Sequence, residues 1–261
     1  MGIAVTAEIA PATFVSKDRQ TTSSVDVERR PTRCSTCSLR ELCLPRGIKS
    51  ADAKSVDELV FMRRHIRRGE SLYRTGAPFK YLYAVRSGFL KSYIIADDGR
   101  EQVTGFQMAG EMVGLDGIES DAHNLNVEAI EDTMVCVIPF ARLEQLASRV
   151  PELQRQFYRM MSHEIVRDQG VMMLLGTMQA NERVAAFLLN LSQRFAARGY
   201  AAAEFLLRMT REEIGSYLGL KLETVSRVFS KLQKARLIEI RNKHVRIRNP
   251  SGLKAVLDQA M

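Results

Sequence analysis

Apolar and polar residues follow two different patterns along the chain. Within residues 67–140, short apolar runs such as 82–85 and 90–95 are separated by eight glycines. The sequence Asp97-Asp98-Gly99 is typical of a hairpin turn, because glycine takes the positive φ that tight hairpins require. Many short strands at this spacing predict an antiparallel sandwich or roll. The apolar positions of residues 51–66, which precede the strands, predict one short helix.

The sequence predicts a long helix that begins at Pro151 and continues to about Met178. Proline is tolerated in the first turn of a helix, because the N–H that it lacks would have no partner there. Apolar residues at spacings of 3, 4, 7 and 3 share one side of this helix: Tyr158, Met161, Ile165, Met172 and Leu175. Such an a/d seam pairs with another helix, and the commonest partner is a second copy of the chain. We therefore predict a homodimer whose interface includes Met161, Ile165, Asp168 and Met172.

Asp168 interrupts this seam. A two-fold axis through the seam would bring Asp168 near its symmetry mate, where two carboxylates repel or one takes up a proton. The dimer would then be marginal and adjustable. Alternatively, Asp168 is solvated or paired with Arg159 or Arg167. The sequence leaves both interpretations open.

A second helical region begins at Asn181 and ends in a recognisable motif. Thr210 and Glu213 have the spacing of a capping box at a helix start, and Gly219 is placed to end that helix. A further helix follows over residues 222–232. Two helices joined by a three-residue glycine turn predict a helix-turn-helix.

The second helix of this motif has an inner and an outer face. Apolar residues at helical spacing are predicted to pack inward: Leu222, Val225, Phe229 and Leu232. Glu223, Ser226 and Arg227 face outward, where Arg can bind guanine O6 and N7 and Glu can accept from cytosine N4. Glu223 and Arg227 could instead form a routine helix salt bridge. Because the helix follows this turn in a basic segment, we interpret the outward residues as base-reading.

Charge is unevenly distributed along the 261 residues, whose net charge is +8. Residues 181–261 contain 15 Lys and Arg against 7 Asp and Glu, which accounts for the whole excess. An alternating basic hairpin is expected near residues 237–248, suited to phosphate. The C-terminal third is therefore predicted to bind a polyanion, namely double-stranded DNA.

Other chemistry is less evident in the sequence. No apolar run approaches the ~18–20 residues that span a bilayer, and there is no secretory signal, so we expect a cytoplasmic protein without a membrane partner. The four histidines are scattered and no nucleophile–base pattern accompanies them. We therefore do not expect an enzyme.

Three of the four cysteines lie in one short segment. Cys34, Cys37 and Cys43 are spaced C-x2-C-x5-C, and Cys136 lies in the last predicted strand. A ten-residue segment has no core of its own in which to bury three thiols, so a metal or cluster explains their density better than packing does. Disulfides are disfavoured in the cytoplasm. An iron–sulfur cluster, a structural zinc ion and a thiol-redox site remain open, and Cys136 alone could be a buried filler.

Together these motifs resemble the CRP/FNR superfamily of bacterial transcription regulators, and the cysteine pattern resembles its oxygen-sensing FNR branch. The resemblance implies an α+β fold with an antiparallel β-roll of the cyclic-nucleotide-binding type as sensor domain, a long dimerisation helix and a C-terminal winged helix-turn-helix. It also implies a [4Fe-4S] cluster on four cysteines: Cys34, Cys37, Cys43 and Cys136. Glu223, Ser226 and Arg227 match the family's base-reading positions, and Asp168 matches its charged dimer-helix position.

The function implied by the resemblance is oxygen-responsive transcription activation. The intact cluster would promote homodimerisation and binding to a palindromic TTGAT-N4-ATCAA-like operator, and oxygen would degrade the cluster and end that binding. RNA polymerase would be a partner. The alternative is a constitutive or thiol-redox-controlled regulator with a structural zinc ion, or no metal, on the same cysteines.

Two features depart from the superfamily pattern. No Lys or Arg occurs between Arg100 and Arg142, so a nucleotide phosphate in the roll would lack a counter-charge, and we expect no cyclic nucleotide. Lys221 occupies the N-cap of the second helix, where Ser or Thr caps better. The expected organisation is a mobile tail (1–33), a cysteine loop (34–47), a β-roll sensor domain (48–150), a dimerisation helix (151–180) and a winged helix-turn-helix (181–261).

Overall fold

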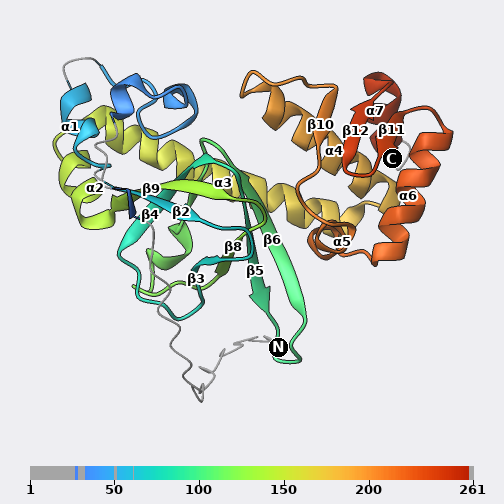
Figure 1. Cartoon of the computed structure of the whole chain (residues 1–261), viewed down its shortest axis with the longest axis horizontal. Coiled ribbons are helices and arrows are strands. Elements are labelled where there is room, and N and C mark those ends of the chain that lie inside the picture. Colours follow the sequence, from blue (N-terminus) through green and yellow to red (C-terminus); the bar gives the residue numbers. More distant parts are fainter. Residues whose placement is uncertain (1–26, 29–32, 50–51, 61, 259–261) are drawn as a thin grey trace, which may run out of the picture.

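The computed structural model describes residues 27–28, 33–49, 52–60 and 62–258, so the predicted tail lies almost wholly outside the described part. An N-terminal β-rich domain and a C-terminal, mainly helical domain are connected by one long helix (Figure 1). This architecture confirms the predicted α+β class.

The N-terminal domain contains two antiparallel sheets. The first has the order β1-β2-β9-β4-β7. Its strands are β1 (Val27–Glu28), β2 (Met62–Ile66), β4 (Tyr81–Ser87), β7 (Met112–Val113) and β9 (Thr133–Pro139). The second has the order β3-β8-β5-β6. Its strands are β3 (Ser71–Tyr73), β5 (Phe89–Ile95), β6 (Glu101–Met108) and β8 (Asn126–Ala129).

The two sheets enclose one core, and the first sheet has a second core on its outer face. Successive side chains of a strand point to opposite faces. Val135 and Val137 of β9 therefore pack inside the roll, whereas Cys136 and Ile138 belong to the outer cluster. The predicted hairpin turn is present between β5 and β6, and Gly99 there has φ +82°. A 3-10 turn, Leu115–Gly117, follows β7.

The outer face of the first sheet is covered by the cysteine loop and by two short helices. The loop contains the 3-10 turns Cys34–Thr36 and Arg40–Leu42, and the helices are α1 (Ala53–Asp57) and α2 (Phe140–Ala147). Leu44 and Ile48 at the end of the loop share a buried cluster with Leu153 and Phe157 of the long helix. The cysteine loop is thus packed against the start of that helix.

The long helix is α3 (Pro151–Thr177), and Pro151 lies in its first turn as predicted. Its first turns are buried against the roll, but much of its apolar side is not. Ile165 is 58% exposed and Met172 63% exposed. A soluble helix face of this kind normally packs against another surface.

The C-terminal domain is built from four helices and a small sheet. The helices are α4 (Ala180–Ala196), α5 (Arg211–Leu218), α6 (Leu222–Lys234) and α7 (Pro250–Asp258). The sheet has the order β10-β12-β11, with β10 (Glu204–Leu206), β11 (Ile238–Arg241) and β12 (His244–Ile247). Strands β11 and β12 form the predicted hairpin.

The predicted helix-turn-helix is confirmed in its local detail. Thr210 Oγ1 accepts a hydrogen bond from the Glu213 backbone N–H at 3.1 Å, and Glu213 Oε2 accepts from the Thr210 N–H at 2.7 Å. This is the reciprocal capping box. Gly219 ends α5 with φ +62°, a left-handed conformation that most residues with a Cβ avoid.

The two domains are docked against each other through β6. Ser216 of α5 accepts from the Val103 N–H at 2.8 Å and donates to the Glu101 carbonyl at 2.9 Å. Phe106 and Val103 of the roll belong to the same buried cluster as the C-terminal domain core. The core is therefore continuous from one domain to the other.

One local prediction is wrong. A single helix was expected over residues 51–66, but the described part contains only the five-residue helix α1, and Met62–Ile66 is strand β2. Strand β2 pairs with β9 along its whole length, from Met62 opposite Val137 to Ile66 opposite Thr133. Pairing with a distant strand outweighed the local helical spacing. Along β2, the backbone N–H and C=O groups that face β9 form hydrogen bonds with it, so the segment is stable as a strand.

Candidate metal centre and nucleic-acid interface

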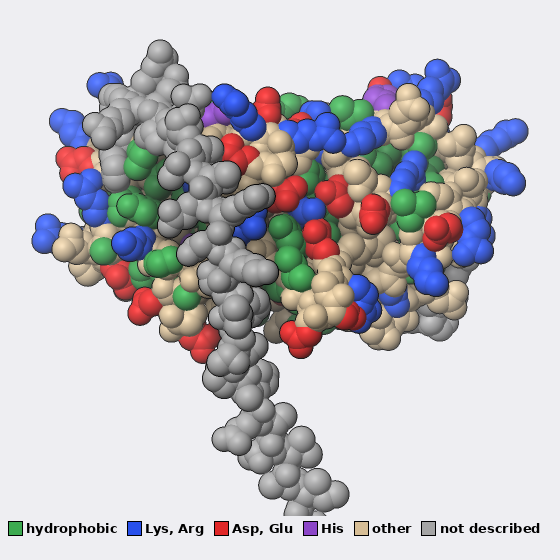
Figure 2. Space-filling model, turned by 60° about the horizontal axis from the view of Figure 1, so that its bottom comes forward, with side chains coloured by type: hydrophobic (Ala, Val, Ile, Leu, Met, Phe, Trp, Pro, Cys, Tyr) green, Lys and Arg blue, Asp and Glu red, His purple; other side chains and the backbone are tan. Residues whose placement is uncertain are grey.

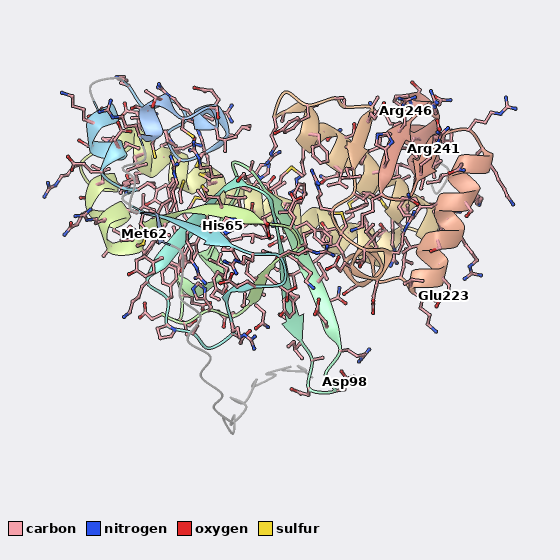
Figure 3. All side chains as sticks on the ribbon, in the orientation of Figure 1. Met62, His65, Asp98, Glu223, Arg241 and Arg246 are labelled. Atoms are coloured by element: carbon pink, nitrogen blue, oxygen red, sulfur yellow. The ribbon has the colours of Figure 1, made fainter. Side chains whose placement is uncertain are left out.

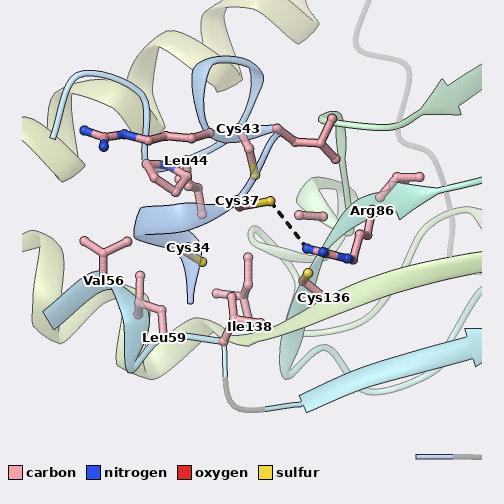
Figure 4. Close-up of a pocket in the computed structure, with 15 residues that line it drawn as sticks. Cys34, Cys37, Cys43, Leu44, Val56, Leu59, Arg86, Cys136 and Ile138 are labelled. Carbon is pink, nitrogen blue, oxygen red and sulfur yellow. Dashed lines mark hydrogen bonds between the residues drawn. The ribbon is translucent and has the colours of Figure 1, made fainter. Parts of the chain in front are cut away.

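All four cysteines line one cavity at the outer face of the first sheet (Figure 4). Cys34, Cys37 and Cys43 come from the loop, and Cys136 comes from β9. Cys136 is buried, the three loop cysteines are partly buried, and all four are free thiols. Residues separated by about ninety positions in the sequence are thus brought to the same place.

Local hydrogen bonds shape the loop that presents three of these thiols. The Cys37 N–H donates to the Cys34 carbonyl at 3.2 Å, and the Cys43 N–H donates to the Arg40 carbonyl at 3.4 Å. Ser35 fastens the loop to α1, because its N–H and its hydroxyl each donate to the Asp57 carboxylate at 2.7 Å. These bonds set the shape of the loop and attach it to α1.

The cavity disfavours the thiolate forms of Cys34, Cys43 and Cys136, because each of them has a raised pKa. Burial, together with the neighbouring Cys43 and Cys136, raises the pKa of Cys34 to about 12. Burial also raises the pKa of Cys43 to about 12 and that of Cys136 above its ordinary value. A cationic centre would stabilise several thiolates here, and binding of such a centre releases protons.

The chemistry of the donors and of the walls is that of a thiolate-bound iron–sulfur group, although the side chains are not arranged around a common centre. The cavity presents four sulfur donors, and apolar side chains form much of its lining: Leu44, Val56, Leu59 and Ile138. Cys₄ ligation in a shielded apolar site is the ordinary environment of such a group. The enclosed space is about 30 Å³, so the walls of the cavity would have to separate for a cluster to bind. Within the described residues, no group of three or more His, Cys, Asp or Glu side chains is arranged to hold a metal ion.

One residue of this cavity was not predicted from the sequence. Arg86 of β4 lies beside the cysteines, and its guanidinium Nη1 donates to Cys37 Sγ at 3.4 Å. Arg86 looks like an ordinary strand residue in the sequence. Only the pairing of β4 with β9 reveals that it lies near Cys136.

The second candidate site is the outer face of α6. Glu223 and Arg227 are exposed there and Ser226 is partly exposed, as predicted. Figure 3 shows Glu223 at the start of α6, near the edge of the molecule, and Arg241 and Arg246 on the hairpin of the same domain. Lys and Arg side chains line the right-hand end of the molecule in Figure 2, which this domain forms.

The alternative of a Glu223–Arg227 salt bridge is not borne out by the contacts. Over the described part of the chain, these two residues form no ion pair with each other, and Arg227 instead donates to Thr224 Oγ1 at 3.2 Å. Both side chains remain available to an external partner. Hollows of about 530 and 460 Å³ border the same face and are lined by Ser226 and Ser230.

Two predictions about α6 can be compared with the structure. Lys221 is the N-cap, and among the described hydrogen bonds its side chain makes none that caps the helix. Leu222 was expected to pack inward, and this is wrong: it is 44% exposed, while Val228 is buried. Leu222 lies in the first turn of the helix, which projects beyond the domain core.

The α3 face provides the candidate dimer surface. Ile165 and Met172 are exposed, whereas Met161 is partly buried against the outer core. The Asp168 side chain is 62% exposed, and its Oδ1 lies 3.8 Å from Arg167 Nε. This contact is too exposed to be worth more than about 1 kcal/mol.

A further cavity of about 470 Å³ lies between the roll and α3 and is lined in part by Ser92, Gln107 and Arg167. Arg167 of α3 contributes a positive charge to this cavity. The lack of Lys and Arg between Arg100 and Arg142 therefore does not mean that the cavity has no cation. The Arg167 guanidinium Nη2 lies 2.5 Å from the Glu164 carboxylate Oε2. Burial nevertheless raises the pKa of Glu164 to about 7. The expectation of no cyclic nucleotide stays a prediction.

Comparisons with known proteins agree with this architecture. Residues 63–150 match the cyclic nucleotide-binding domain family, and residues 182–256 match the Crp-like helix-turn-helix domain family. Over 223 residues the chain is 48% identical to the transcriptional activator protein Anr of Pseudomonas protegens, covering 85% of this chain and 91% of that protein. It is 43% identical over 223 residues to the fumarate and nitrate reduction regulatory protein of Salmonella typhimurium, covering 85% and 89%.

A solved structure shows the same fold. FixK2 from Bradyrhizobium japonicum aligns with a TM-score of 0.69 and 34% identity, covering 74% of this chain and 96% of that one. The β-roll, long helix and winged helix-turn-helix therefore define a DNA-binding transcription regulator. The chain belongs to the CRP/FNR family, and within it to the FNR-type regulators. Members of this family are transcription regulators and not enzymes.

No helix among the described residues is long and apolar enough to cross a membrane.

Proposed function

We propose that this regulator is a cytoplasmic, oxygen-responsive activator whose signal is received by a [4Fe-4S] cluster on Cys34, Cys37, Cys43 and Cys136. The observation that carries the proposal is the convergence of a loop and a distant strand on one apolar cavity lined by four thiols. Soft sulfur donors without accompanying carboxylates favour iron–sulfur or zinc chemistry over hard cations. The bound cluster would hold four thiolates in place, and oxygen would remove it.

The path from this site to the dimer helix is short. Leu44 and Ile48, next to Cys43, share a buried cluster with Leu153 and Phe157 of α3. The Lys49 ammonium also lies 3.7 Å from the Glu152 carboxylate. A cluster that fixes the loop would therefore alter the packing at the start of α3. A coupling of ~1–3 kcal/mol is enough for a usable switch.

We further propose that the α3 faces of two chains pair in the cluster-bound form. The two α6 helices would then lie about 34 Å apart, one turn of DNA, and contact both halves of a palindromic TTGAT-N4-ATCAA-like operator. RNA polymerase would be engaged once the dimer is bound. No cyclic nucleotide is required, because the signal enters at the sulfur site and not at the cavity beside Arg167.

Anaerobic purification tests the proposal directly. We expect a coloured protein that contains iron and acid-labile sulfide, is dimeric, and binds a palindromic duplex; after exposure to air, all three properties should be lost together. A colourless protein containing zinc would identify the structural-zinc alternative. A metal-free protein with a reductant-reversible disulfide would identify the thiol-redox alternative.

Replacing Arg227 by alanine should weaken operator binding by ~1–3 kcal/mol and relax the preference at one base pair of each half-site, because a bidentate base contact is lost. Binding to a series of singly substituted duplexes measures this. The control is Arg241→Ala in the exposed hairpin, which should weaken all duplexes alike and reduce the salt dependence of binding. If Arg227→Ala weakens binding to all duplexes equally, Arg227 contacts phosphate and does not read a base.

Asp168→Ala should yield a dimer that binds the operator in air. The substitution removes paired carboxylates from the seam, whose repulsion opposes dimerisation. Sedimentation under air reports the oligomeric state, and Gln169→Ala, a neutral exposed neighbour on α3, is the matched control. A monomeric Asp168→Ala protein in air would show that repulsion at this position does not regulate the dimer.

A further inference from the structure

The side chain of Arg86 faces the cysteine cavity, and an irregularity in the sheet lies beside it. Strands β4 and β9 pair regularly until Val85 meets Val135, and the register then shifts before Ser87 meets Met134. Arg86 falls at this shift. Arg86 lies two residues from Ala84, which pairs with Cys136, so strand alternation places it on the same outer face. Bulges are frequent beside functional sites.

Arg86 contacts both groups of cysteines. Its Nη1 donates to Cys37 Sγ of the loop at 3.4 Å, as drawn in Figure 4. It also lies beside Cys136 of β9 in the same cavity, close enough for a side-chain hydrogen bond. One guanidinium therefore connects the loop to the strand.

A cation is needed at this position once a centre is bound. Four thiolates give a cluster a net negative charge, and apolar side chains such as Leu44, Leu59 and Ile138 cannot offset it. A buried charge is costly unless it is paired and hydrogen-bonded. Because Arg86 belongs to a strand held between β9 and β7, its backbone does not depend on the cysteine loop.

Arg40 is the natural comparison, because it also lines the cavity. It belongs to the loop itself, and its Nη2 donates to the Ile48 carbonyl at 2.8 Å. No hydrogen bond joins Arg40 to a cysteine sulfur among the described contacts. Arg86 therefore donates a hydrogen bond to a cysteine sulfur, whereas Arg40 donates one to a backbone carbonyl of the loop.

We propose that Arg86 is a positioning residue for the inorganic centre, holding Cys37 and Cys136 in place and offsetting the negative charge of the thiolates. The inference rests on the cluster proposed above. Hydrogen bonds to cluster sulfurs and nearby charge set the reduction potential of iron–sulfur groups. Arg86 therefore sets the potential of the centre and the rate at which air destroys it.

The test uses the full chain reconstituted with iron and sulfide without oxygen, as wild type, Arg86→Gln, Arg86→Lys and Arg40→Gln. Iron and sulfide per chain, the reduction potential, and the rate at which the visible absorption fades in air are measured. Arg86→Gln should have a more negative potential and lose its cluster about 10-fold faster, the scale on which groups supporting metal ligands act. Arg86→Lys should be intermediate, because it keeps the charge and loses the planar fork. Arg40→Gln should resemble wild type.

Equal potentials and fading rates in wild type and Arg86→Gln would overturn the inference, as would an equally large effect of Arg40→Gln. If Arg86→Gln does not fold, as judged by circular dichroism, Arg86→Lys decides: values equal to wild type overturn the inference and intermediate values support it. A wild-type protein that takes up no iron and sulfide would refute the proposed cluster and this inference together. A loaded wild type with an unaffected Arg86→Gln refutes the inference alone.

Discussion

Cys136→Ser should leave the fold in place and abolish cluster binding. Among the described residues that line the cavity, Cys136 is the one sulfur that comes from the sheet, so its removal leaves three loop thiols for a group that requires four ligands. Without that ligand the loop is no longer tied to β9. We therefore expect loss of iron and sulfide after anaerobic reconstitution, and operator binding about 5- to 150-fold weaker, the range of a typical allosteric coupling.

Val137→Ala provides the control for this experiment. Val137 is the next residue of the same strand, but it packs inside the roll and not in the cysteine cavity. Val137→Ala should lose some stability and retain the cluster. Iron and sulfide assays, together with DNA binding without oxygen, distinguish the two variants. Full cluster loading by Cys136→Ser would exclude Cys136 as a ligand.

Glu111→Gln should reduce the free energy of unfolding by ~3–5 kcal/mol, because it leaves buried arginines without their counter-charge. Arg194 Nη2 and Arg198 Nη2 each donate to the Glu111 carboxylate at 2.6 Å. Glu111 belongs to the roll, Arg194 to the last turn of α4 and Arg198 to the turn after that helix, so the same change should loosen the docking of the two domains. Denaturant unfolding of the full chain measures the loss.

The pH dependence gives this prediction a second measurement. Burial alone would raise the pKa of Glu111, but Arg194 and Arg198 outweigh burial and lower it below its usual range. The carboxylate therefore contributes stability that is present above the ordinary value of 4.5 and is lost as the pH falls through the lowered pKa. The difference between wild type and Glu111→Gln should shrink in acid.

Glu131→Gln is the matched control for Glu111→Gln. Glu131 of the roll lies 3.1 Å from Arg208 of the C-terminal domain, so this pair joins the same two domains, but it is more exposed. Its loss should cost no more than about 1 kcal/mol. Equal effects of the two substitutions would show that burial does not determine the strength of the domain contact.

These contacts suggest how a signal could pass between distant parts of the chain. The cysteine loop packs on the first turns of α3, and β6 holds the C-terminal domain through Ser216 and through the cluster around Phe106. A change at the sulfur site thus acts on a helix that is itself between two packed domains. The dimer proposed above would use the exposed remainder of that helix.

The sequence by itself determined the elements whose signals are local. The capping box at Thr210, the glycine turn at Gly219 and the proline start of α3 each depend on residues a few positions apart, and all were predicted. The cysteine spacing likewise indicated a site because three thiols are close in the chain. Hydrophobic periodicity also identified the strand that contains Cys136.

Only the tertiary structure decided which residues share a surface. Strand β2 was assigned to a helix because its pairing with β9 is long-range, and Leu222 was assigned to the core because its position at the projecting end of α6 depends on the packing of the domain. Arg86 at the cysteines, Arg167 in the roll cavity and Glu111 against α4 were not predicted. Their roles depend on contacts between segments that are far apart in the sequence. The spacing of residues within one segment does not reveal such contacts.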